Sequence, residues 1–127
     1  MKLLENRTKE ELIEKLSIAK EPIVIYGAGV SGQVLLLACK GAGIQVESFC
    51  DNNIKKKGKA LNGLEIIHTN DIKNRHPEAI FLISAADIID IKQHLVDYGY
   101  FESNLHPGGI FLKGFDYSEF KNHYEPY

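Results

Sequence analysis

The 127-residue sequence is short of cysteine, of net charge and of long hydrophobic runs. Its two cysteines, Cys39 and Cys50, cannot build a disulfide framework, and neither belongs to a Cys-x-x-Cys or Cys/His zinc pattern. Lys and Arg total 15 against 17 Asp and Glu, a formal net charge of -2. No overall field therefore favours nucleic acid or an anionic membrane as a partner. Both cysteines are expected to be small core side chains in a reducing compartment.

No segment has the features of an export signal or a membrane span. Charged residues follow residues 1–4 at once, which leaves no apolar core for a signal peptide. The longest apolar run, residues 34–39, is far too short to cross a bilayer. We therefore expect a soluble, cytoplasmic protein.

Apolar segments of two periodicities alternate along the chain, with 44% hydrophobic and 25% charged residues overall. The predicted strands cover residues 23–26, 44–50, 64–67, 79–83 and 102–105. The predicted helices cover residues 8–20, 31–41, 69–76 and 87–97. Two of the strands are apolar throughout, which indicates a sheet covered on both faces. The sequence predicts one α/β domain, doubly wound, with about five mainly parallel strands.

Local signals mark where these elements begin and end. Thr8 and Glu11 have the spacing of a capping box, and Thr69 and Asp87 are candidate caps for later helices. Residues 52–63 are predicted to be a polar loop. We divide the chain into an N-terminal helix, a central α/β domain and an aromatic-rich tail, at residues 1–21, 22–110 and 111–127.

A glycine-rich loop follows the first predicted strand and opens a helix, the context in which G-x-G-x-x-G indicates phosphate binding. Its candidate binding residues are Gly27, Gly29, Val30, Ser31 and Gly32. Gly27 permits the tight turn, Gly29 lets a phosphate approach the backbone, and Gly32 allows close helix packing. The helix N-terminus then favours an anion.

Three further candidates follow other strands. Asp51, with Asn52 beside it, ends the second strand 19 residues after Gly32, where a carboxylate can accept two hydrogen bonds from a ribose diol. Ser84 ends the fourth strand and could line the same crevice. Residues 55–57, all lysine, could reach a phosphate beside Asp51, or could be a solvated loop. Alternatively, the glycines only make a turn, Asp51 only caps a loop, and the site is empty.

Nothing in the sequence points to catalysis or to a metal. His68 and His106 each follow a strand without a partner that would make a metal site. Tyr117 and Lys121 have the Tyr-x-x-x-Lys spacing of short-chain dehydrogenases, but they lie too close to the glycine loop for that family. We therefore expect no catalytic residue and no metal ligand in this chain.

One connected pattern in the sequence resembles a known domain. It consists of residues 25–29, Gly32, residues 49–53, Gly58, Asn62-Gly63 and Ile66-Ile67. It is similar to the Rossmann-like N-terminal domain of bacterial surface-polysaccharide enzymes, namely FkbM-type methyltransferases and sialic-acid or bacillosamine-type sugar acetyltransferases. The resemblance covers about residues 20–107. It implies that the glycine loop and the acidic loop at Asp51-Asn52 face a nucleotide-sugar. The histidine base of the acetyltransferases is absent, because Val30-Ser31 stands in its place.

The tail holds six aromatic residues: Phe111, Phe115, Tyr117, Phe120, Tyr124 and Tyr127. Such a dense aromatic segment needs a partner, which could be its own domain, a second copy of the chain, or a missing C-terminal domain. The chain stops in the middle of this pattern, so we expect a fragment of a longer transferase.

The sequence therefore predicts a module that binds a nucleotide, a nucleotide-sugar or NAD(P) and that catalyses no reaction of its own. The alternatives are a fragment of an NAD(P)-dependent oxidoreductase and a non-catalytic interaction domain.

Overall fold

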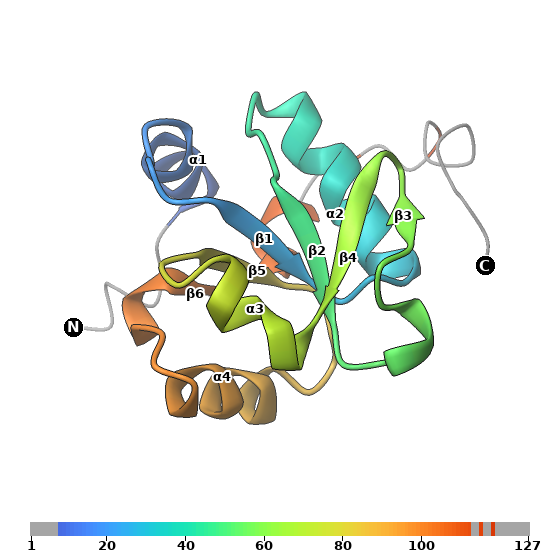
Figure 1. Cartoon of the computed structure of the whole chain (residues 1–127). Coiled ribbons are helices and arrows are strands. Elements are labelled where there is room, and N and C mark those ends of the chain that lie inside the picture. The colour runs from blue at the N-terminus through green and yellow to red at the C-terminus, as the bar shows by residue number, and fades with distance from the viewer. Residues whose placement is uncertain (1–7, 113–114, 116–117, 119–127) are drawn as a thin grey trace.

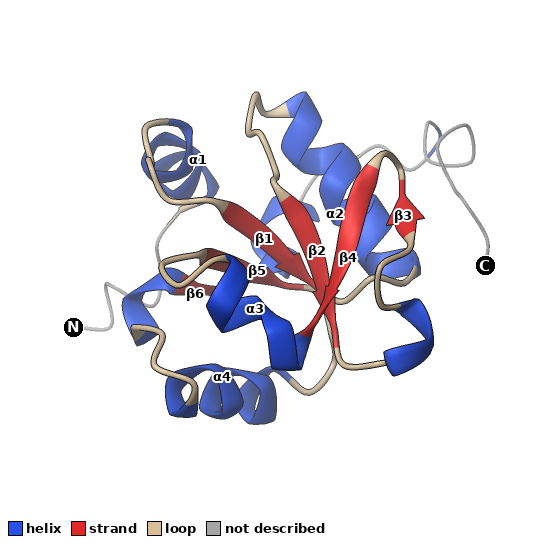
Figure 2. Ribbon diagram, viewed as in Figure 1, coloured by secondary structure: helices blue, strands red, loops and turns tan. Residues whose placement is uncertain are grey.

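A six-stranded sheet with helices packed against it forms the part of the chain that the computed structural model describes, residues 8–112, 115 and 118 (Figures 1 and 2). The strands are β1 (Ile23–Tyr26), β2 (Ser48–Asp51), β3 (Ala60–Leu61), β4 (Leu64–His68), β5 (Ile80–Ile83) and β6 (Leu105–Pro107). The helices are α1 (Lys9–Ser17), α2 (Val30–Gly41), α3 (Thr69–Arg75) and α4 (Ile88–Asp97). The α/β class is confirmed.

The strand order is β3-β4-β2-β1-β5-β6, and every neighbouring pair is parallel except β3 with β4. The mainly parallel sheet is therefore confirmed, with six strands among the described residues where about five were expected. Parallel pairing places the carboxyl ends of β1, β2, β4, β5 and β6 at one edge of the sheet. That edge carries the loops that the sequence analysis singled out.

One hydrophobic core lies on each face of the sheet, because successive strand residues point to opposite faces. Ile23 and Ile25 of β1 belong to the core that also holds buried residues of α1 and α2. Val24 and Tyr26 belong to the other core, with residues of α3 and α4. All four residues of β1 and of β5 are buried, as predicted for strands that are apolar throughout.

The first predicted helix, α1, packs into the core on the α2 side of the sheet. Leu12 and Leu16 of α1 are almost fully buried in the same core as α2. The capping box is confirmed: the Glu11 N–H donates to Thr8 Oγ1 at 3.1 Å and the Thr8 N–H donates to Glu11 Oε1 at 2.9 Å. Helix α1 ends at Ser17, three residues earlier than predicted.

The cap of α3 was predicted one residue too late. His68, not Thr69, is the cap, because its Nδ1 accepts the Asn70 N–H at 3.1 Å. Asp87 does precede α4, but its side chain makes no capping hydrogen bond there.

No described helix combines the length and apolar composition that a bilayer crossing requires.

The second strand is shorter than its apolar pattern predicted. The Ile44 N–H donates to the Cys39 carbonyl at 2.9 Å, so this residue closes the turn that follows α2 and is not part of a strand. Ile44 and Val46 are nonetheless buried in the core. Their apolar character reflects burial of side chains and not strand pairing, which begins only at Ser48.

The predicted polar loop at residues 52–63 contains two short elements, a 3-10 helix at Ile54–Lys56 and strand β3. Strand β3 pairs antiparallel with β4. Asn62 and Gly63 link the two strands with φ values of 52° and 83°. An Asn-Gly pair between strands is a strong hairpin signal, so this hairpin could have been predicted.

The last strand was predicted too early. Glu102–Asn104 is a 3-10 helix, and β6 occupies the three residues after it. At the start of the aromatic segment, Phe111 is buried against the chain's own core and Phe115 is half-buried. The other four aromatic residues of the tail lie outside the described residues, and with them most of the expected self-association surface.

Both cysteines are buried free thiols, as expected for small core side chains. Burial raises the pKa of the Cys39 thiol to about 12. Burial, helped by the Asp51 carboxylate, also raises the pKa of Cys50 well above its usual range. A thiol whose pKa is higher in the folded state holds its proton more tightly there. Its contribution to stability is complete below the unfolded pKa and is lost as pH rises toward the folded pKa.

We therefore expect the free energy of unfolding to fall by about 3–4 kcal/mol between pH 8 and pH 10, close to half of it from each thiol. Urea titrations in reducing buffer at both pH values measure this. A Cys39→Ala/Cys50→Ala variant should show a clearly smaller pH dependence than the parent protein. Equal pH dependence in the two proteins would assign the effect to other groups.

Candidate functional site

The predicted binding residues come together at the carboxyl edge of the sheet. The glycine loop follows β1, Asp51 ends β2, and Ser84 follows β5, while β1 lies between β2 and β5. Val30 and Ser31 are exposed in the first turn of α2, and Asn52 is exposed beside Asp51. Residues far apart in the sequence thus share one surface.

The two outer glycines of the loop are required by close contacts. Gly27 has a φ of +112°, and a Cβ there would collide with the Ser84 hydroxyl oxygen. A Cβ on Gly32 would collide with the Gly27 carbonyl oxygen and lie 3.3 Å from Phe49 Cε1. The expected role of Gly32 is therefore refined: it lets α2 pack against the loop itself.

Gly29 has a different environment. It is the N-cap of α2, with φ -114° and ψ -155°, and its position has no side-chain capping bond. A Cβ on Gly29 would have no neighbour within 4 Å. The first N–H groups of a helix lack intrahelical acceptors, and the helix dipole makes this end positive. The surface above Gly29 is therefore open and suited to an anion.

The Asp51 carboxylate ties the end of β2 to the glycine loop. Its Oδ2 accepts the Ala28 N–H at 2.8 Å, and its Oδ1 accepts the Asn53 N–H at 2.8 Å. Its side chain is only 14% exposed. Each carboxylate oxygen can accept about two hydrogen bonds, so acceptor capacity remains for a ribose hydroxyl. Asp51 thus holds the loop in place, a role that sequence spacing did not reveal.

One of the three consecutive lysines reaches the glycine loop. Lys56 Nζ donates to the Ala28 carbonyl at 3.2 Å and lies 3.7 Å from Asp51 Oδ2. Lys57 instead pairs with Asp71 at 3.1 Å, and Lys55 is exposed. The Lys56 ammonium therefore brings a positive charge to the same surface as the N-terminus of α2.

Ser84 braces the loop from the other side. Its hydroxyl contacts the Tyr26 carbonyl at 3.0 Å and the Gly27 carbonyl at 3.3 Å, and its own N–H donates to Tyr26 O at 2.9 Å. On the side of β4, the buried His68 ring contacts the Asn52 carbonyl through Nε2 at 3.2 Å. Ser84 and His68 thus hold the backbone of the loops at the carboxyl edge of the sheet, through contacts with backbone carbonyl groups.

The remaining candidates do not assemble into a reactive centre. His106 Nε2 lies 3.3 Å from Lys15 Nζ, far along the chain from His68. Residues 8–112 with 115 and 118 contain no group of three His, Cys, Asp or Glu placed to hold a metal ion. Tyr117 and Lys121 lie outside the described residues.

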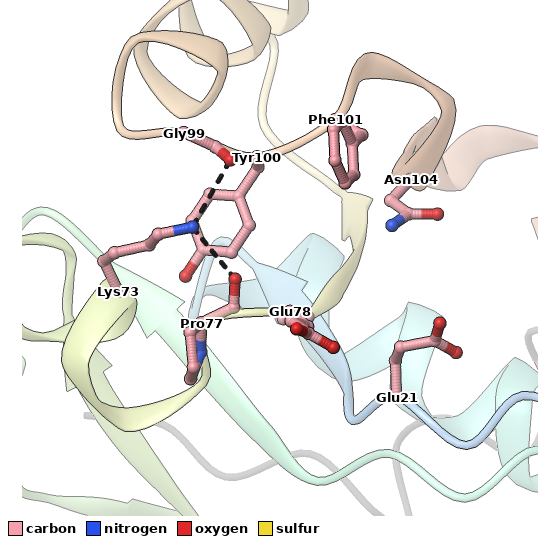
Figure 3. Close-up of a pocket in the computed structure, with 9 residues that line it drawn as sticks. Glu21, Lys73, Pro77, Glu78, Gly99, Tyr100, Phe101 and Asn104 are labelled. Atoms are coloured by element: carbon pink, nitrogen blue, oxygen red, sulfur yellow. Dashed lines mark hydrogen bonds between the residues drawn. The ribbon is translucent and has the colours of Figure 1, made fainter.

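A pocket of about 410 Å³ lies at the opposite, amino edge of the sheet (Figure 3). Its walls come from the segments that precede β1, β5 and β6, including Glu21, Glu78 and Asn104. No sequence motif marks this pocket, and its residues are scattered along the chain, so the sequence alone did not predict it.

The comparisons with known proteins place the chain in a family. No curated protein matches it. The sequence pattern of the family described as "C2185-like, N-terminal" matches residues 19–105, about two-thirds of the chain. The matched segment contains the glycine loop, Asp51, Lys56 and Ser84, together with most of the sheet. The chain therefore belongs to the C2185-like N-terminal domain family.

Proposed function

We propose that this domain binds a nucleotide, nucleotide-sugar or dinucleotide through its phosphate groups. The observation that carries the proposal is the open N-terminus of α2 at Gly29, with the Lys56 ammonium held on the same loop. Backbone N–H groups, the helix dipole and a lysine all favour a negative ligand. Asp51 supplies an acceptor for a neighbouring ribose.

The order of the strands supports the proposal that the fold is Rossmann-like and doubly wound. From β1, the chain first builds outward through β2 and β4, and then returns to the other side of β1 with β5 and β6. In open α/β sheets, ligands bind outside the carboxyl ends of the strands at such a reversal. Here the reversal lies between β1 and β5, where the glycine loop meets Ser84.

We further propose that the domain holds or positions a substrate for a larger enzyme of surface-polysaccharide synthesis, a methyltransferase or an acetyltransferase. This part rests on the resemblance to the N-terminal domains of such enzymes. The described site contributes phosphate-binding and ribose-binding groups and no nucleophile or general base. The buried free thiols fit the reducing, cytoplasmic setting in which we place it.

A fragment of an NAD(P)-dependent oxidoreductase is the second candidate, favoured by the position of Lys56. The Lys56 ammonium lies 3.7 Å from Asp51, the residue expected beside the adenosine ribose. A cation there suits a 2′-phosphate. Preference for NADP over NAD and over UDP-sugars would distinguish this role.

A third candidate, an interaction domain with an empty site, is favoured by the internal bonds of Asp51. Its two oxygens already accept two backbone N–H groups, so the loop is ordered without a ligand. A thermal-shift screen of the purified protein with UDP-sugars, NAD, NADP and S-adenosylmethionine tests all three roles. A positive shift with a phosphate-bearing compound supports the proposal, and no shift with any compound supports the empty site.

The substitution Asp51→Ala should weaken a ribose-bearing ligand at least tenfold. It removes an acceptor whose hydrogen bonds contribute on the order of 1.5–3 kcal/mol each. The 2′-deoxy form of the same ligand should lose less affinity, since one of those bonds is already missing. Calorimetric titrations of both ligand forms against both proteins measure this difference. Equal losses would restrict Asp51 to its role in ordering the glycine loop.

A further inference from the structure

The pocket at the amino edge has two walls that differ in chemistry (Figure 3). Phe101 and Asn104 stand on one side, and the side chains of Glu21 and Glu78 lie across from them. Lys73, Pro77 and Tyr100 close one end. The pocket lies at the opposite edge of the sheet from the glycine loop, so the two sites occupy separate surfaces.

At the closed end of the pocket, the polar groups of Lys73 and Tyr100 already have hydrogen-bond partners within the protein. Lys73 Nζ donates to the Pro77 carbonyl at 2.9 Å and the Gly99 carbonyl at 3.3 Å. The same ammonium lies 4.4 Å from the centre of the Tyr100 ring, whose hydroxyl donates to the His76 carbonyl at 2.8 Å. This end is a fixed wall, and the charge of Lys73 is engaged within it.

In the open part of the pocket, an aromatic side chain and two carboxylates are exposed to solvent. Phe101 is 76% exposed, although phenylalanine is usually buried. Glu21 and Glu78 are exposed, and among the described residues neither has an ion-pair partner. An aromatic face opposite two carboxylates attracts a cation that is also flat or apolar, since the ring and the carboxylates then act together.

We propose that this pocket binds an arginine side chain of a protein partner. A guanidinium group stacks on an aromatic ring and donates two parallel hydrogen bonds to a carboxylate, which an ammonium cannot do. Aromatic residues and arginine are enriched in protein interfaces, which favours a polypeptide over a small cation.

A peptide titration followed by amide NMR tests the proposal. The probes are acetyl-Gly-Arg-Gly-amide and the same peptide with citrulline, which has the same shape without the charge. At millimolar concentrations, the arginine peptide should shift the amides of Glu21, Glu78 and Phe101, and the citrulline peptide should bind at least about tenfold more weakly. Equal shifts, or none with the arginine peptide, would overturn the proposal. Methylguanidine that binds as tightly as the peptide would also overturn it, because the site would then select a small cation.

Two variants assign the effect to the pocket. Glu21→Gln/Glu78→Gln should weaken the arginine peptide at least about tenfold, since both carboxylates lose their charge. Glu10→Gln/Asp90→Asn changes the net charge equally at exposed positions outside the pocket and should leave the affinity unchanged. Equal losses in the two variants would show a general charge effect and reject the site. Neither result depends on nucleotide binding at the glycine loop.

Discussion

Replacing Gly32 by alanine is expected to lower the free energy of unfolding by about 3–5 kcal/mol. The new Cβ would collide with the backbone carbonyl oxygen of Gly27 and crowd the Phe49 ring, which is fully buried. The Gly27 backbone has little room to move, because its N–H bonds to the Cys50 carbonyl at 2.8 Å and its carbonyl contacts Ser84. Urea unfolding followed by circular dichroism measures the loss.

The matched control is Gly41→Ala, at the last residue of the same helix. A Cβ at Gly41 would have no neighbour within 4 Å, and alanine has the higher helix propensity by about 1 kcal/mol. This variant should be as stable as the parent protein or slightly more stable. A similar small effect for Gly32→Ala would mean that the loop can move away from α2 at little cost.

Replacing Gly29 by valine is expected to weaken phosphate binding by about 100-fold while the fold is retained. The backbone of Gly29 is extended, a conformation open to any residue, and the space around its Cβ position is empty. A branched side chain there occupies the place where a phosphate must approach. The loss corresponds to about two hydrogen bonds to a charged group. Calorimetry with the compound that gave the largest thermal shift measures the affinity.

The same substitution at the far end of the helix, Gly41→Val, provides the control for adding a β-branched residue to α2. It should leave ligand affinity unchanged, because Gly41 lies more than two turns of α2 from the glycine loop. Urea unfolding should show that Gly29→Val remains folded, with a loss of at most about 1 kcal/mol from the poorer N-cap. Parent-like affinity in a folded Gly29→Val protein would contradict the phosphate-binding proposal.

The sequence alone was sufficient for features that depend on neighbouring residues. Strand β1 was predicted at its observed bounds, because a β-branched apolar run between a proline and a glycine has few alternatives. The capping box at Thr8 and the glycine loop before α2 are local patterns as well. Contacts between such residues form within a few positions of the chain, so their spacing determines them.

Tertiary structure decided which of these residues meet, and for what purpose. Asp51 was predicted at the end of its strand, but its bond to the Ala28 N–H depends on the parallel register of β1 and β2. The selection of Lys56 from three equivalent lysines depends on how the 3-10 helix at Ile54–Lys56 turns toward the loop.

The amino-edge pocket depends on tertiary structure altogether. Its walls come from Glu21, from Glu78 57 positions later (78 minus 21), and from the segment that begins at Gly99 after a further 21 positions (99 minus 78). Only the strand order brings these segments together. Sequence periodicity reports which face of an element is buried. It carries no information on which distant loops become neighbours, because that follows from the order and register of strands in the assembled sheet.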